Sequence, residues 1–469
     1  MTSPPDPATP EVLPTAPGFA RACQLDALGR TEEAKQEYLA FLAGSPTHFG
    51  ALNNLGTLLY ESGYRSAART AYAEAVKHHP GNPVGHINLA NLLLASGELA
   101  EARRHYEAAL ALSPDHDEAH RGFANLLAEL GEDDAAEAHR RAAYRDKAVV
   151  VQRYRGTPPG IPLLLLVSAL GGNVPTRLLI DDRLFAVTAL VADYVDPATP
   201  LPPHRLVFNA IGDADLSPRA LEAAARLLAV THYPVLNHPS KIATTGRAAI
   251  ARRFAGVPGI VAPRIVMLPR AALESARGAA LLAESGLAFP LLLRSPGFHT
   301  GRHFVRVEAA SSLSAVLATL PGREVMAMQL LDARGADGLA RKYRVMIVDG
   351  QLYPLHLAIS ADWKVHYFTA AMAEHPEHRA EEAAFLADMA GVLGPVAMAG
   401  LAHIRDALGL DYGGIDFAPG RDGALLLFEA NSTMVVNPPD ADPRWDYRRA
   451  PIERVLAAAR RMVGRLAAG

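Results

Sequence analysis

Two short segments near the carboxyl end of the sequence carry oxygen donors at a spacing suited to a metal ion. Asp416 lies in a Gly-Ile-Asp-Phe segment, and Glu429 and Asn431 lie in a Phe-Glu-Ala-Asn segment that follows it. Both segments have the pattern of strands in a hairpin, and side chains two apart on a strand share one face. Because Mg²⁺ prefers carboxylate and amide oxygens, we expect these three residues to hold this ion. The alternative, acids at exposed strand ends, leaves the apolar residues around them unexplained.

Two basic residues occupy alternate positions of another predicted strand. Lys342 and Arg344 lie in the segment Lys-Tyr-Arg-Val-Met-Ile-Val, so they share one strand face. A salt-bridged edge strand is the alternative interpretation. The sequence shows no serine–histidine–acid motif and no cysteine nucleophile motif, which is consistent with chemistry that needs no protein nucleophile.

The elements that would position these residues begin after a Gly- and Pro-rich linker at residues 154–160. Strand-like runs lie at 161–170, 185–195, 204–211 and 231–238, with an Ala- and Leu-rich helix at 217–229. Strands that alternate with helices imply a mostly parallel sheet with flanking helices.

After residue 240 the pattern changes from parallel to antiparallel. A helix at 244–259 is followed by strand-like runs at 262–268, 289–295, 303–309, 325–331, 342–350 and 351–358. Helices return near 379–408, and the two acid-bearing strands come last. We expect these strands to form antiparallel sheets.

The first third of the chain repeats itself every 34 residues. The aligned positions are Gly29, Gly63, Gly97 and Gly131; Ala34, Ala68, Ala102 and Ala136; Tyr38, Tyr72 and Tyr106; and Pro46, Pro80 and Pro114. The glycine allows a sharp turn between two helices, the alanine allows them to approach closely, and the proline ends the second helix. A fourth unit has Arg140 and Ala148 in place of the tyrosine and the proline, as expected of a terminal cap.

These units resemble tetratricopeptide repeats, which stack into a superhelix with a concave face. The resemblance implies a partner, a peptide or protein, rather than a reaction. The first helices carry asparagines whose amides would reach the backbone of an extended peptide: Asn53, Asn54, Asn88, Asn91 and Asn125. In the alternative interpretation these asparagines cap or cross-link neighbouring helices.

Composition limits the partners and the compartment. The net charge of −3 and the pI near 6.7 give no sign of nucleic acid or membrane as a partner. A single cysteine, Cys23, excludes an intramolecular disulfide and fits a reducing compartment, so we expect a cytoplasmic protein. Residues 1–18 are rich in proline and have the composition of a disordered lead-in, not a signal peptide, and the apolar run 161–170 is about half the ~20 residues of a membrane span.

The region from about Asn237 to Asn437 resembles the ATP-grasp superfamily, especially its peptide-bond-forming carboxylate–amine ligases, in the order of its motifs. The helix at 244–259 looks like the opening helix of that family, with Arg247 in place of a nucleotide-contacting lysine. Residues 289–307 resemble its strand, glycine loop and returning strand, with Arg294 in place of the usual lysine. A guanidinium binds phosphate in a planar fork whereas an ammonium is a point charge, so the geometry of ATP binding would differ.

The resemblance implies roles for further residues. Gly297 and Gly301 would give the loop flexibility, and His299, Thr300 and His303 would donate to phosphates unless they form a solvated loop face. The segment around Gln329 and Leu331 would contact adenine, and Asp332 would hold the ribose. Lys342 and Arg344 match basic residues that meet the transferring phosphate and the acyl intermediate.

The acceptor end of the site is the part where the sequence departs from the family. Residues 356–368 would lie over that end, and the candidates for contacting substrate are His356, Trp363, Lys364 and His366. The alternative is a surface hairpin with Trp363 packed beneath it. Relatives commonly continue from the asparagine into a Pro-Gly turn, but here Asn431 is followed by Ser-Thr-Met-Val-Val-Asn-Pro-Pro.

Together these features predict several domains: a lead-in at 1–18, an all-α tetratricopeptide superhelix at 19–150, a Rossmann-like α/β pre-ATP-grasp domain at 160–240 and an α+β ATP-grasp domain at 241–469. The resemblance implies that a carboxylate attacks ATP to form an acylphosphate, which an amine then converts to an amide. It assigns catalysis to Arg294, Lys342 and Arg344, magnesium to Asp416, Glu429 and Asn431, and ATP binding to Arg247, Arg294, Gly297, Gly301, Gln329, Leu331, Asp332 and Lys342.

Other functions remain open at this stage. A peptide or protein held by the repeats is the expected substrate, and homo-oligomer formation is left open. The alternatives are a small-molecule ligase whose repeats mediate oligomerisation, a nucleotide-binding scaffold without turnover, and phosphoryl transfer without ligation.

Overall fold

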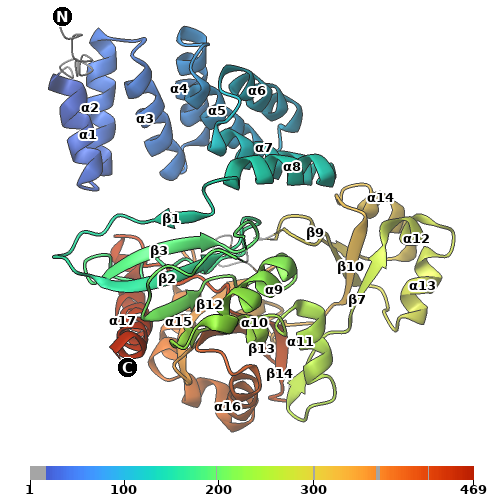
Figure 1. The fold of residues 1–469 in the computed structure, drawn as a ribbon. Coiled ribbons are helices and arrows are strands. Elements are labelled where there is room, and N and C mark those ends of the chain that lie inside the picture. The colour runs from blue at the N-terminus through green and yellow to red at the C-terminus, as the bar shows by residue number, and fades with distance from the viewer. Residues whose placement is uncertain (1–16, 197, 299–300, 366–369, 421, 469) are drawn as a thin grey trace, which may run out of the picture. The chain divides into compact units, whose positions relative to one another are not determined.

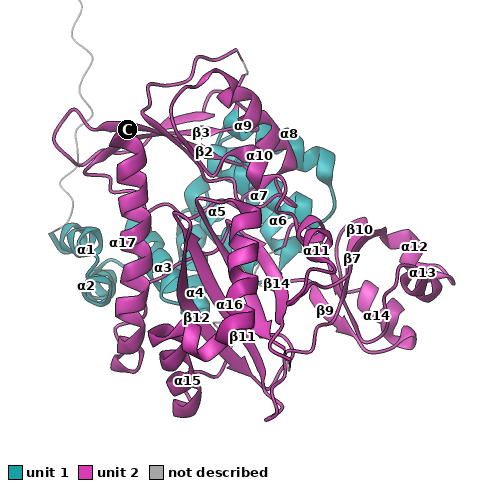
Figure 2. Ribbon diagram, turned by 90° about the horizontal axis from the view of Figure 1, so that it is seen from below, with its two compact units in different colours: residues 1–144 teal, residues 145–469 magenta. Residues whose placement is uncertain are grey.

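The computed structural model describes residues 17–196, 198–298, 301–365, 370–420 and 422–468. They form two compact units, one within Met1–Tyr144 and one within Arg145–Gly469 (Figure 2). Residues 1–16 of the predicted lead-in lie outside the described residues, and Pro17 and Gly18 belong to the first helix.

The first unit is a series of antiparallel helix pairs (Figure 1). The helices are α1 (Pro17–Ala27), α2 (Thr31–Gly44), α3 (Phe49–Glu61), α4 (Arg65–His78), α5 (Pro83–Ala95), α6 (Leu99–Leu112), α7 (Asp117–Glu129) and α8 (Asp133–Tyr144). The four glycines of the repeat lie between the two helices of a pair and have positive φ angles of 73, 84, 80 and 77°. Glycine adopts such angles without a steric cost, so the predicted turn is confirmed.

Repeating tyrosines pack neighbouring helices together, both within a pair and between successive pairs. Tyr38 and Tyr106 are fully buried and Tyr72 is nearly so. A Cβ added to Gly122 would lie 2.5 Å from the ring of Tyr106, and one added to Gly56 would lie 2.6 Å from the ring of Tyr72. These glycines of the first helices therefore make room for the tyrosine side chains of neighbouring helices.

Most of the asparagines proposed for peptide binding instead join neighbouring helices. Asn88 Nδ2 donates to Asn53 Oδ1 at 2.7 Å, Asn54 Nδ2 donates to the Tyr38 hydroxyl at 3.1 Å, and the Tyr106 hydroxyl donates to Asn91 Oδ1 at 2.5 Å. The cross-linking alternative thus holds for these four asparagines. Asn125 is exposed on α7 and stays a candidate for contacting a partner.

A histidine pair recurs in the last two repeats, and its spacing was not recognised in the sequence. His86 and His105 lie with their Nδ1 atoms 3.0 Å apart, and His120 and His139 repeat the contact at 2.7 Å. His86 and His120 also bond through Nε2 to the carbonyl oxygens of Pro80 and Pro114. Burial, and then the neighbouring ring, lower the pKa of His105 and of His139.

The second unit begins with a five-stranded sheet in the order β1-β3-β2-β4-β5. Its strands are β1 (Val149–Val151), β2 (Ile161–Val167), β3 (Phe185–Val191), β4 (Leu206–Asn209) and β5 (Val235–Leu236). They run parallel except for β1, which is antiparallel to β3. The helices α9 (Pro218–Leu227) and η1 (Leu228–Val230) lie between β4 and β5 in the chain, and α10 (Pro239–Ile242) and α11 (Arg247–Phe254) follow β5. The predicted parallel sheet is present, and the predicted repeat boundary at residue 150 falls inside β1.

Two antiparallel sheets follow, as predicted. The smaller has the order β7-β10-β8-β9, with β7 (Ile265–Pro269), β8 (Leu291–Arg294), β9 (Phe304–Val307) and β10 (Glu324–Gln329), together with α12 (Arg270–Glu274), α13 (Gly278–Glu284), η2 (Ala310–Ser312) and α14 (Leu313–Leu317). The larger has the order β12-β11-β13-β14-β6, with β11 (Ala340–Val348), β12 (Gln351–Ser360), β13 (Tyr412–Pro419), β14 (Leu425–Asn431) and the short parallel β6 (Ile260–Val261). The remaining helices are α15 (Pro376–Ala387), α16 (Met389–Leu408), η3 (Pro443–Trp445) and α17 (Asp446–Ala468).

One hydrophobic core joins the first and the third of these sheets. Leu163 and Phe208 of the parallel sheet belong to the same buried cluster as Met346 of β11 and Val455 of α17. The segments predicted as separate domains at 160–240 and 241–469 therefore share this core. Among the described residues no single helix is long and apolar enough to cross a bilayer, and the bent pair α15 and α16 meets that criterion only when taken together.

The histidine pairs predict a loss of stability in mild acid. A histidine whose folded-state pKa is lowered binds protons less readily than in the unfolded chain, so stability should fall as the pH drops below about 6.5. Calorimetry of the full chain should show that the melting temperature falls between pH 7.5 and pH 5.5. The fall should be smaller for the double variant His105→Gln, His139→Gln than for wild type. His78→Gln, a surface change in α4, is the control, and equal drops in all three proteins would contradict the role of the pairs.

Candidate functional site

Four ionisable side chains form one row across the larger antiparallel sheet. His356 of β12 lies opposite Arg344 of β11, Arg344 lies opposite Asp416 of β13, and Asp416 lies opposite Glu429 of β14. Directly opposed residues on antiparallel strands point to the same face with Cβ atoms about 5 Å apart. These four residues, called the charged row below, confirm that the two predicted acid-bearing strands are hairpin neighbours.

Asp416 is the buried centre of the charged row. Arg344 donates to both of its oxygens, from Nε at 2.6 Å and from Nη2 at 2.8 Å, and Lys342 Nζ lies 3.1 Å from Oδ2. Burial alone would raise the pKa of Asp416, but Arg344 and Lys342 outweigh it and hold that pKa far below its usual value. The carboxylate is therefore charged at any physiological pH, and two of the three predicted catalytic residues, Lys342 and Arg344, are its counter-ions.

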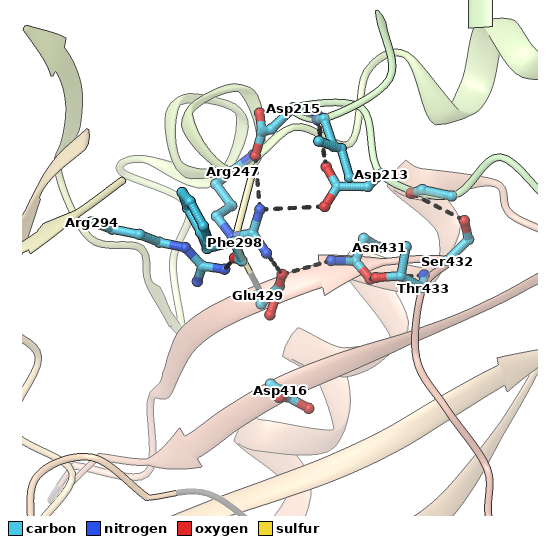
Figure 3. Close-up of polar contacts among 12 residues, drawn as sticks. Asp213, Asp215, Arg247, Arg294, Phe298, Asp416, Glu429, Asn431, Ser432 and Thr433 are labelled. Carbon is cyan, nitrogen blue, oxygen red and sulfur yellow. Dashed lines mark hydrogen bonds and ion pairs between the residues drawn. The ribbon is translucent and has the colours of Figure 1, made fainter. Parts of the chain in front are cut away.

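Glu429 and Asn431 face a different cation. Glu429 Oε1 accepts from Arg247 Nη2 at 2.5 Å and from Asn431 Nδ2 at 2.8 Å, and Asn431 Oδ1 accepts from the backbone and hydroxyl of Thr433 (Figure 3). Burial would raise the pKa of Glu429, yet Arg247 and then Arg294 hold it below its ordinary range. The predicted metal ligands thus lie together, and each carboxylate pairs with a basic side chain.

Two further acids at this site were missed by the sequence analysis. Asp213 and Asp215 lie in the loop after β4, and Arg247 Nη1 lies 3.7 Å from the first and 3.1 Å from the second (Figure 3). Asp215 also accepts from the backbone N–H of Arg247, and a Cβ on Gly246 would come within 2.6 Å of Asp215 Oδ1. The sequence did offer a signal for them, because both acids follow the carboxyl end of a predicted parallel strand. Ligands commonly bind at that edge of a parallel sheet.

Arg247 is therefore enclosed by three carboxylates, those of Asp213, Asp215 and Glu429. Burial would lower its pKa, but these acids, Glu429 first, raise it above the usual value for arginine. The guanidinium stays protonated and links the loop after β4 to β14 through the first turn of α11.

Arg294 is close to this cluster but has no acid of its own. Its Nη2 donates to the carbonyl oxygen of Phe298 (Figure 3). Its guanidinium lies 5.7 Å from the ring centre of Phe304. In the described part of the chain, no carboxylate lies within ion-pair distance of Arg294. Burial, and then the charge of Arg247, lower the pKa of Arg294, so an anion bound beside it would be stabilised.

The predicted glycine loop is a turn between β8 and β9. Gly297 and Gly301 have φ angles of 83 and 74°, which favour glycine. Lys364 Nζ donates to the carbonyl oxygens of Gly301 and, at 3.2 Å, Phe304, and it thereby joins this loop to the segment after β12. Trp363 packs edge-on against Phe304. His299, Thr300 and His366 lie outside the described residues.

The residues predicted to contact adenine and ribose lie at the far end of β10. Gln329 pairs with Leu291, whereas Arg294 pairs with Met326 on the same two strands. The Gln329 side chain accepts from the backbone of Arg264, and Asp332 is exposed and paired with Arg334. Leu331, between them, is partly buried. Nearer to Glu429 there is a small pocket, and its lining includes Thr245, Arg247, Ile250, Ile265, Leu427 and Glu429.

His356 ends the charged row within the sheet. It is buried, and burial followed by the charge of Arg344 lowers its pKa well below the usual value, so the ring is neutral. The neutral imidazole lies opposite Arg344 in the sheet and adds no charge to the row.

Removing the central cation should destabilise the fold. Arg247→Met removes the cation that pairs with Asp213, Asp215 and Glu429, and we expect a loss of roughly 3–5 kcal/mol in the free energy of unfolding, because breaking a buried ion pair leaves an uncompensated charge. Arg247→Lys, which keeps the charge, should lose less. Urea unfolding followed by circular dichroism measures both, and an Arg247→Met protein as stable as wild type would contradict the proposed balance of charges.

Comparisons with known proteins concern the first unit. Family models described as tetratricopeptide repeat match residues 19–83, 59–108 and 93–139. A search of the curated proteins found no significant match.

Solved structures similar to part of this chain include the following three. MamA (41–end) from Desulfovibrio magneticus is 18% identical, with 28% of this chain and 76% of that chain covered at a TM-score of 0.26. A thermophilic TPR protein from Thermus thermophilus is 24% identical, with 28% of this chain and 73% of that chain covered at a TM-score of 0.26. The protein pilF of Pseudomonas aeruginosa is 24% identical, with 27% of this chain and 59% of that chain covered at a TM-score of 0.26. The family models, together with the eight helices and the repeated glycine turns, identify residues 19–139 as an array of tetratricopeptide repeats.

Proposed function

We propose that the second unit is an ATP- and Mg²⁺-dependent ligase of the ATP-grasp type, which joins a carboxylate to an amine through an acylphosphate. The observation that carries the proposal is the charged row with its surrounding bases. Two acids, Asp416 and Glu429, lie opposite each other on adjacent strands, and Lys342, Arg344 and Arg247 surround them. Such a site can hold a divalent cation and a polyphosphate at the same time.

The donor set fits magnesium. Asp416 and Glu429 offer carboxylate oxygens, and Asn431, two residues beyond Glu429 on β14, offers an amide. Mg²⁺ binds through one or two carboxylates plus phosphate oxygens, and it would neutralise the charge on the phosphates. The basic side chains that now pair with these acids would then be released toward the phosphates.

The surroundings favour a nucleotide. Arg294 carries a positive charge without a carboxylate partner among the described residues, and it lies at the start of a glycine-containing turn. The pocket beside Glu429 has an apolar side formed by Ile250, Ile265 and Leu427. In this structure the pocket has room for about one water molecule, so a purine base would enter it only after its walls move apart.

The chemistry follows from positioning and charge rather than from a protein nucleophile. A substrate carboxylate oxygen forms a bond to the γ-phosphorus of ATP while the bond to the β–γ bridging oxygen breaks and ADP leaves. An amine nitrogen then bonds to the acyl carbon, phosphate leaves, and the amine loses a proton. Arg294, Lys342 and Arg344 would stabilise the negative charge that accumulates on the transferring group.

The repeat array supports a macromolecular substrate, because tetratricopeptide repeats bind peptides or proteins far more often than they catalyse. A peptide or protein carrying the reacting carboxylate or amine is therefore the proposed substrate. A ligase for small molecules, with the repeats used for oligomerisation, would instead turn over free amino acids.

A nucleotide-binding scaffold without turnover is the second candidate. The observation that favours it is the short ion pair between Arg247 and Glu429, because it occupies a carboxylate that the metal needs. In a ligase this pair has to open when Mg²⁺ and ATP bind.

Calorimetric titration with a nonhydrolysable ATP analogue and Mg²⁺ tests the site. Wild type should bind the analogue only when Mg²⁺ is present. The double variant Glu429→Gln, Asn431→Ala should bind it about 10–100-fold more weakly or worse, since changes around a metal commonly cost that much. Asp349→Asn, which removes an exposed partner of Arg465, is the matched control and should bind like wild type. No binding by wild type would overturn the proposal.

Product analysis separates the ligase from its alternatives. Incubation with ATP, Mg²⁺ and a peptide library should release ADP and phosphate in equal amounts and give products that are heavier peptides by mass spectrometry. A phosphorylated product without free phosphate would indicate phosphoryl transfer, and tight ATP binding without ADP release would indicate the scaffold.

A further inference from the structure

A group of metal-binding side chains lies at the start of α15 and shares no residue with the charged row. His375, Glu377 and His378 each place one ligand atom so that the three atoms lie within 4.8 Å of one another. His375 is the residue before the helix, and His378 lies three positions later. Residues at these two positions are neighbours in the first turn of a helix, which explains why the short segment His-Pro-Glu-His brings its ligands together.

The buried member of this group has an unsatisfied nitrogen. His378 is only 8% exposed, and its Nδ1 has no hydrogen-bond partner among the described residues. Leaving such a polar atom buried and unpaired costs about 1–3 kcal/mol. His375 and Glu377, in contrast, are exposed and held together by a bond of 2.9 Å from Nδ1 to Oε1, and the two histidine rings stack with centres 4.5 Å apart. The site therefore has one fixed ligand and two that can move toward it.

The backbone that leads into the site is fixed by other contacts. Arg379 Nη1 donates to the carbonyl oxygens of Met372 at 2.9 Å and Ala373 at 2.6 Å, and Met372 is buried. These bonds hold the turn before His375 against α15. Two of the three ligand side chains stay on the surface, so solvent and ions can reach the site.

We propose that His375, Glu377 and His378 bind a divalent transition-metal ion of the zinc class. Two imidazoles and one carboxylate are the ligand set of zinc sites that keep a position for water or substrate, and imidazole favours such ions over Mg²⁺. Ligands of a tetrahedral zinc ion are roughly 3.3 Å apart, given bonds of about 2.0–2.1 Å. The ligand atoms now lie within 4.8 Å of one another, so the surface side chains need to close by at most about 1.5 Å. The carboxylate of Glu377 offsets the positive end of the helix dipole, which would otherwise disfavour a cation there.

Zinc titration of the full chain in Mg²⁺-free buffer, with a chromophoric chelator as competitor, tests this site. His375→Asn should bind one zinc ion fewer than wild type, and Glu377→Gln should bind this ion at least about tenfold more weakly. His78→Asn is the matched control, because His78 forms a similar surface pair with Glu74 at 3.2 Å but belongs to no three-ligand group among the described residues. The control should keep the wild-type stoichiometry.

The same zinc stoichiometry in wild type, His375→Asn and Glu377→Gln would overturn the proposal. His378→Asn tests the buried ligand, and its folding is checked by circular dichroism. If that variant fails to fold, the two surface variants still decide the outcome, since they leave the core of the helix unchanged. ATP is absent from all these titrations, so failure of the ligase proposal would leave their result unaffected.

Discussion

The burial of Asp416 and Glu429 on adjacent strands is the constraint around which the second unit is organised. Two carboxylates directly opposite each other in a sheet repel one another, and each loses hydration energy on burial. Such a pair is stable only if cations surround it. Arg344 and Lys342 on β11 neutralise Asp416, and Arg247 on α11 neutralises Glu429, so the larger sheet, the opening helix and the loop after β4 are held together by charge.

The proposed ligase would use this arrangement to bind a metal ion and phosphates. The acids stay ionised, because the neighbouring bases lower the pKa values of Asp416 and Glu429 despite burial. The bases stay protonated, and Arg294 beside them has no acid partner in the described part of the chain. A bound metal would replace the bases at the acids, and phosphates would replace the acids at the bases.

In the core of the repeat array, close packing of side chains and hydrogen bonds between helices replace the ion pairs of the second unit. Glycines of one helix leave room for the tyrosine of its neighbour, and asparagine side chains join neighbouring helices. A position used for such a contact is not available to a ligand. Surface residues of the first helices, such as Asn125, are therefore better candidates for contacting a partner than the four asparagines that join helices.

The 34-residue period and the hydrophobic pattern of the sequence were sufficient to predict the helix pairs, the parallel strands and the antiparallel hairpin that carries Asp416 and Glu429. These features depend on near neighbours, on the 34-residue repeat and on alternation along a strand. The approach of Asp213 and Asp215 to Arg247, the pairing of β1 with β3 and the core shared by α17 and the parallel sheet join segments that are far apart in the chain. No local pattern encodes such contacts.

By itself, the sequence therefore determined the kinds of element, and it singled out acids on β13 and β14 and bases on β11 that the structure places side by side. Only the tertiary structure decided which charges meet: Arg344 and Lys342 with Asp416, and Arg247 with Glu429, Asp213 and Asp215. The physical reason is that a charge interacts through space, and its strength depends on burial and distance, which the order of residues along the chain does not specify.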